Sequence, residues 1–104
     1  MVGEARAAAL SAAKAEVDAF YKREGPAFKE KLRRAKIRSE AQAIYLDFTR
    51  KTQFINFELP DRTMEEVRPA LREYILEQQS TSLKSLMDYY SKRYDELLKQ
   101  EYGK

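Results

Sequence analysis

The feature that most constrains this chain is the scarcity of residues that interrupt helices. Its 104 residues include three glycines and three prolines, and residues 27–59 and 70–102 contain neither. Strong helix-forming residues dominate both stretches. The alternation of apolar and polar residues that is typical of a half-buried strand is rare. The sequence therefore predicts an all-α protein.

Breakers and hydroxyl residues divide the chain into expected helices. Gly25–Pro26 is expected to end the first helix, because glycine suits the position after a helix and proline disfavours helix in the residue before it. The apolar face changes near Ser39 and near residues 80–82, which predicts two further breaks with hydroxyl N-caps. Residues 59–62 are expected to form a loop, followed by a capping box at Thr63. The expected helices span residues 4–23, 27–37, 40–57, 64–79 and 82–102.

Two of these breaks have an alternative. Residues 27–57 could instead form one long helix, and residues 64–102 a continuous kinked helix. We expect a compact bundle of four to five helices, mostly antiparallel and joined by short connections. A length of about 100 residues is typical of one domain, so we expect residues 1–104 to form a single helical domain.

The chain has no histidine and no cysteine. It therefore cannot build a Ser-His or Cys-His nucleophile, and it lacks the imidazole and thiolate ligands of zinc, iron–sulfur and haem sites. The sequence also contains neither a glycine-rich phosphate loop nor a calcium-binding loop. We therefore expect a protein that is not an enzyme, with no catalytic residues, no metal site and no cofactor.

Charge is unevenly distributed along the sequence. Residues 1–52 carry 12 basic and 7 acidic side chains, whereas residues 53–104 carry 8 basic and 10 acidic ones. Within residues 29–38 there are six basic side chains and one acidic side chain. A helix of this composition presents a positive face that suits an acidic protein surface or a phosphate backbone. Self-association through the oppositely charged halves is a third hypothesis.

Aromatic side chains are the second candidate feature, with seven tyrosines and five phenylalanines. Tyrosine favours interfaces, because its ring can be buried while its hydroxyl stays in water. Phe54 and Phe57 fall off the apolar stripe of their helix, as do Tyr89 and Tyr102. The candidate partner-binding residues are Lys29, Lys31, Arg33, Arg34, Lys36, Arg38, Phe54, Phe57, Tyr89 and Tyr102.

These features favour a non-catalytic protein–protein interaction module, or a small accessory subunit of a larger assembly, that recognises an acidic and apolar partner surface. The alternative is a nucleic-acid-binding helical protein that uses the basic helix 29–38. The low net charge of +3 favours the first interpretation. No apolar run is long enough to span a membrane, and the N-terminus lacks the features of a secretory or transit signal. We therefore expect a soluble, intracellular protein.

Overall fold

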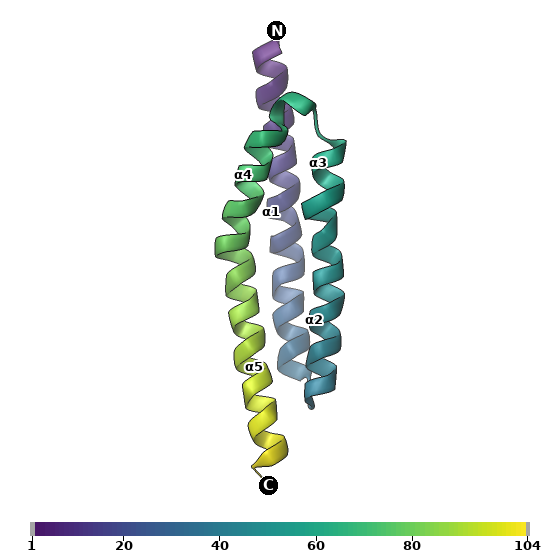
Figure 1. Cartoon of the computed structure of the whole chain (residues 1–104), viewed down its shortest axis with the longest axis vertical. Coiled ribbons are helices and arrows are strands. Elements are labelled where there is room, and N and C mark those ends of the chain that lie inside the picture. The colour runs from purple at the N-terminus through teal and green to yellow at the C-terminus, as the bar shows by residue number, and fades with distance from the viewer. Residues whose placement is uncertain (1, 104) are drawn as a thin grey trace.

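The computed structural model describes residues 2–103, which form three long helical rods along a common axis (Figure 1). The first rod is α1 (Val2–Arg34). After a turn, the second rod returns alongside it as α2 (Arg38–Gln53) and continues through the π-helical segment η1 (Phe54–Glu58) into α3 (Leu59–Arg62).

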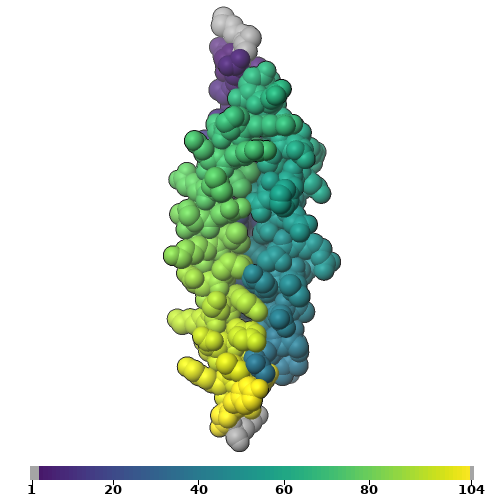
Figure 2. Space-filling view, in the orientation of Figure 1, coloured from purple at the N-terminus to yellow at the C-terminus, as the bar shows by residue number. Residues whose placement is uncertain are grey.

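A short connection with the 3-10 segment η2 (Glu65–Val67) leads to the third rod. This rod is formed by α4 (Arg68–Gln78), the π-helical segment η3 (Gln79–Leu83) and α5 (Lys84–Tyr102) without interruption. The second rod is antiparallel to the other two, so that α1 and α5 run in parallel (Figure 1). Figure 2 shows the face on which α2 and the third rod lie side by side.

The prediction of an all-α protein is confirmed, since the described part of the chain contains helices and no strand. The expected number of four to five helices is wrong, because the segments join into three rods. The bundle is also elongated, not compact. It measures 66 × 18 × 17 Å and has a radius of gyration of 17.0 Å, compared with about 13 Å for a compact domain of this length.

The predicted end of the first helix at Gly25–Pro26 is wrong. The expected helices 4–23 and 27–37 form the single helix α1, which has Pro26 in its interior. Gly25 is buried, and its nearest neighbours across the rods are the methyl groups of Leu86. Packing along the whole length of α1 therefore outweighs the local preference of these two residues, which is a weak determinant of structure by comparison.

The predicted break near Ser39 is confirmed, although it lies slightly earlier, at residues 35–37. The alternative of one helix over residues 27–57 is therefore wrong. The expected hydroxyl cap is also wrong, because α2 begins after Ile37, which has an extended backbone and makes no side-chain capping bond. Instead, the carboxylate of Glu40 accepts the backbone N–H of Lys36 at 3.1 Å.

The end of α1 is stabilised by Arg93 of α5. Its guanidinium donates hydrogen bonds to the backbone carbonyls of Leu32 at 2.9 Å and Ala35 at 2.6 Å, and a longer one to that of Arg33 at 3.3 Å. The last carbonyls of a helix have no partner within the helix. A side chain that is distant in sequence therefore supplies the cap that glycine or a hydroxyl residue would supply locally.

The expected loop at 59–62 and the expected break at 80–82 are both wrong, since both segments are helical. The alternative of a continuous helix over the last part of the chain is confirmed, although it begins at Arg68. A π-helical turn accommodates one extra residue, which shifts the following apolar stripe by about 100° in a count of regular α-helical positions. In the structure the stripes before and after η3 both face the core, so this turn explains the apparent change of face that predicted a break.

The capping box predicted at Thr63 is absent. The hydroxyl of Thr63 donates to the carbonyl of Leu59 at 2.6 Å, and η2 follows Met64 without a side-chain cap. Pro69 lies in the first turn of α4, where its missing N–H removes no helical hydrogen bond.

The core runs along the rods and takes apolar side chains from all three of them. At its centre, the ring of Phe48 lies 4.4 Å from that of Phe28 and 6.1 Å from that of Phe20, measured between centroids. The buried apolar residues of this cluster are Ala13, Val17, Phe20, Phe28, Leu32, Ala35, Ala41, Phe48, Ile55, Leu59, Leu71, Ile75, Leu86 and Leu97.

Candidate functional site

The ten candidate residues do not form one site. The six basic residues belong to the last turns of α1, the following turn and the first residue of α2. Tyr89 and Tyr102 lie on α5, which passes this region, whereas Phe54 and Phe57 lie on η1 towards the opposite end of the bundle (Figure 1). We call the region formed by Lys31, Arg33, Arg34, Lys36, Ile37 and Tyr102 the basic end.

Two arginines of the basic end share a single carboxylate. Arg33 Nη2 lies 2.6 Å and Arg34 Nε 2.9 Å from Glu30 Oε1. The hydrogen bond from Arg33 is the main cause that holds the pKa of Glu30 below its usual value. Lys31 and Lys36 are exposed, and neither has an ion-pair partner among residues 2–103. The local charge therefore remains positive after the internal pairing.

Arg38 is engaged in a contact between helices. Its Nε donates to Glu101 at 2.6 Å, and its backbone N–H donates to the same carboxylate at 3.2 Å. Its guanidinium also lies 5.8 Å from the ring centroid of Tyr94 and 5.3 Å from that of Tyr102. The backbone N–H of Arg38 is the main cause that lowers the pKa of Glu101. Arg38 thus joins the start of α2 to the end of α5.

The two tyrosines differ in exposure. Tyr102 is 75% exposed, although its ring contacts Arg38. Tyr89 is half-buried against the core, and Lys29 Nζ lies 5.6 Å from the centroid of its ring. The structure therefore brings Lys29 and Tyr89 together, as a contact between α1 and α5. Tyr102 therefore exposes most of its ring to solvent, whereas Tyr89 exposes less.

Phe54 and Phe57 also differ. Phe54 is half-buried against the core, whereas Phe57 is 66% exposed. Across the groove between η1 and α4, Leu76 is 62% exposed. These two side chains border an open hollow of about 490 Å³, whose lining residues are Asn56, Phe57, Pro60, Arg72, Ile75, Leu76 and Gln79.

The exposure of Leu76 was not predicted, because a leucine in a predicted helix is normally a core residue and nothing in its neighbourhood marked it as exposed. The contact between the two π-helical segments was not predicted either. Gln79 Nε2 of η3 donates to Asn56 Oδ1 of η1 at 2.6 Å. This bond fixes the two segments side by side at the edge of the hollow that Phe57 borders.

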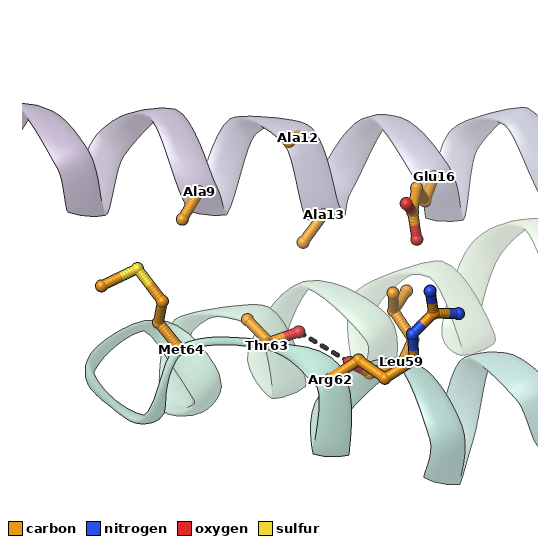
Figure 3. Close-up of a pocket in the computed structure, with 8 residues that line it drawn as sticks. All are labelled: Ala9, Ala12, Ala13, Glu16, Leu59, Arg62, Thr63 and Met64. Atoms are coloured by element: carbon orange, nitrogen blue, oxygen red, sulfur yellow. Dashed lines mark hydrogen bonds between the residues drawn. The ribbon is translucent and has the colours of Figure 1, made fainter.

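A second hollow, of about 220 Å³, lies between the first half of α1 and the connection that follows α3 (Figure 3). Small side chains such as Ala9 and Ala13 line its α1 side, and Met64 and Arg62 face them from the other side (Figure 3). The space arises because alanine side chains cannot fill the gap between the rods. None of the predicted site residues borders it.

Within residues 2–103, no group of carboxylates is arranged to hold a metal ion. Among residues 2–103, none of the helices combines the length and the hydrophobicity that a membrane span requires. No protein-family model matches the chain, and neither does any curated protein or solved structure. The functional interpretation therefore depends on the geometry of the surface.

Proposed function

We propose that this chain is a non-catalytic protein–protein interaction module, or a small accessory subunit of a larger assembly, that recognises an acidic and apolar partner surface through the basic end. The observation that supports the proposal is the composition of this region. Exposed cations of the last turns of α1 lie at the same end of the bundle as two exposed apolar side chains, Ile37 at 46% and Tyr102 at 75% exposure. Carboxylates of a partner would pair with the cations, while the two apolar side chains would lose contact with water.

Four of the predicted cations are proposed to contribute to recognition. Lys31, Lys36, Arg33 and Arg34 carry the positive charge that remains after internal pairing. Arg38 forms the contact between helices described above, so its substitution would remove that contact as well as a surface charge. The test is therefore best made on cations outside that contact.

The first experiment is affinity purification from the source cell, with and without nuclease, read by mass spectrometry. The proposal expects a few proteins that co-purify in stoichiometric amounts and survive nuclease. Loss of all partners on nuclease treatment would refute it and favour the alternative, a nucleic-acid-binding protein. For that alternative, affinity for an oligonucleotide would fall steeply with salt, because each neutralised phosphate releases counterions.

The second experiment reverses the charge of Arg33, Arg34 and Lys36 together. Binding of the purified partner should be lost, while the helical circular dichroism stays unchanged. The matched control reverses Lys84 and Lys92, two exposed lysines of α5 outside the basic end. Unimpaired binding in the triple variant would show that the basic end is not the recognition surface.

A further inference from the structure

Gly25 and Pro26 are both unfavourable residues for the interior of a helix, yet α1 continues through them. In the interior of a helix, glycine costs about 1 kcal/mol relative to alanine, and proline costs about 3 kcal/mol because it lacks the N–H that bonds to the carbonyl four residues earlier. Here that carbonyl belongs to Lys22. The pair therefore destabilises a helix whose remaining residues are good helix formers.

Packing does not require either residue. None of the glycines in the described part of the chain has a positive φ, so Gly25 is not needed for a left-handed backbone. A Cβ on Gly25 would lie 3.7 Å from a methyl group of Leu86, which is an ordinary contact distance. Pro26 is exposed. Residues that break a local rule without a packing gain mark functional positions in natural proteins.

A second irregularity lies on the opposite side of the same groove. The π-helical segment η3 contributes Ser82, and the first turn of α5 contributes Ser85 and Leu86. Single π-helical turns within α-helices occur frequently at functional sites. The two irregular segments border one open hollow of about 430 Å³, lined by Tyr21, Lys22, Gly25, Pro26, Lys29, Ser82, Ser85 and Leu86. Its volume lies within the range of small-ligand sites.

The lining combines an apolar surface with cations. The ring of Pro26 and the side chain of Leu86 are apolar, and the absence of a side chain at Gly25 leaves the space between them open. Lys22 and Lys29 are seven residues apart on α1 and therefore lie on the same face. The hydroxyl of Ser85 adds a hydrogen-bond donor, whereas that of Ser82 donates to Gln78 Oε1 at 3.0 Å. Neither lysine faces an acidic side chain in this lining.

We propose that this hollow binds a small amphipathic anion, which is a molecule with an apolar body and a carboxylate or phosphate monoester group. The apolar body would occupy the space above Gly25 and contact Pro26 and Leu86. The anionic group would pair with Lys22 or Lys29, because a lysine ammonium acts as a point charge and can bind either a carboxylate or a phosphate. This site goes beyond the proposed function, because it lies in the groove between α1 and α5 and not at the basic end.

The test is a titration of the full chain followed by nitrogen–proton correlation NMR. The probes are phenylbutyrate and phenyl phosphate, which carry both halves of the proposed ligand. Phenylbutanol and inorganic phosphate each carry one half. We expect saturable shifts of the amides that line the hollow with at least one of the two complete probes, and binding about tenfold weaker with either half. Equal binding of phenylbutanol, or no shift at these amides at millimolar probe, would overturn the proposal.

Two variants test the assignment of residues. Exchange of Lys22 and Lys29 together for glutamine should weaken binding of the complete probe about tenfold, since a hydrogen bond to a charged group is lost. Ser85→Phe should abolish binding by filling the hollow. Lys84→Gln, one residue from Ser85 but outside the lining, is the matched control and should bind as the original chain does. The same spectra report whether each variant is folded. Unchanged binding in both test variants would refute the site.

Discussion

Replacement of Pro26 by alanine should stabilise the protein. Pro26 lies in the interior of α1, where it supplies no N–H to the carbonyl of Lys22. Because Pro26 is exposed, its removal leaves no cavity in the core. The expected change is therefore governed by the backbone of the helix and not by packing.

The magnitude follows from two opposing effects. An interior proline costs a helix about 3 kcal/mol relative to alanine. Proline also restricts the unfolded chain, and this effect, which stabilises the original protein, amounts to about 0.4–1 kcal/mol. The free energy of unfolding of Pro26→Ala should thus rise by about 2 kcal/mol. For a domain of this size, that corresponds to an increase of about 10 °C in Tm.

The measurement is urea and thermal unfolding, followed by circular dichroism. Pro69→Ala is the matched control, because Pro69 lies in the first turn of α4, where its N–H would have no partner within the helix. Because only the restriction of the unfolded chain is lost there, Pro69→Ala should lower the free energy of unfolding by about 0.4–1 kcal/mol. A neutral or destabilising Pro26→Ala would refute the reasoning. It would also remove the argument that the Gly25–Pro26 pair is retained at a cost to stability.

Three further predictions concern contacts between the rods and the register of the third rod. Arg93→Ala should lower the free energy of unfolding by about 2 kcal/mol in urea titrations, because carbonyls at the end of α1 lose their donor; an unchanged midpoint would contradict this cap. The hydrogen bond to Asp18 is the main cause that raises the pKa of Tyr74 from 10.0 to about 12. The original chain should therefore have a higher free energy of unfolding than Tyr74→Phe below pH 10, and this difference should disappear between pH 10 and 12. A difference that does not depend on pH would contradict the hydrogen bond. Deletion of Ser80 should convert η3 into regular α-helix and leave unfolding cooperative, because it removes the extra residue that the π-helical turn accommodates and brings the apolar stripes of α4 and α5 into one α-helical register; loss of cooperative unfolding would contradict this, and Ser80→Ala, as the control, should unfold normally.

Irregular positions in the helices could be located from the sequence more reliably than their causes could be identified. The change of apolar face near residue 80 was real, yet its cause was a π-helical turn and not a break. A change of face in the sequence is an offset in the regular α-helical count. One extra residue within a π-helical turn produces such an offset, and so does the start of a new helix. The face change near Ser39, by contrast, did mark a turn. The difference arises because the carbonyls at the end of α1 find a donor in Arg93.

The candidate site was predicted in part. The density of cations in residues 29–38 is visible in the sequence, and five of the six basic side chains lie on the exposed surface, Arg38 being partly covered. The sequence could not show that Arg33 and Arg34 share Glu30 or that Arg38 binds Glu101. It also could not show that Phe57 lies far from the basic end, since this distance depends on the direction in which the second rod runs.

The sequence by itself determined the helical class and, through the absence of histidine and cysteine, the kinds of chemical site that the chain cannot build. These properties depend on composition and on spacing within a few residues. The tertiary structure alone decided that α1 continues through Gly25–Pro26, that it ends where Arg93 reaches its carbonyls, and that two irregular segments border one hollow. Each of these depends on groups about sixty residues apart in the chain, whose contacts outweigh the local preferences of the backbone.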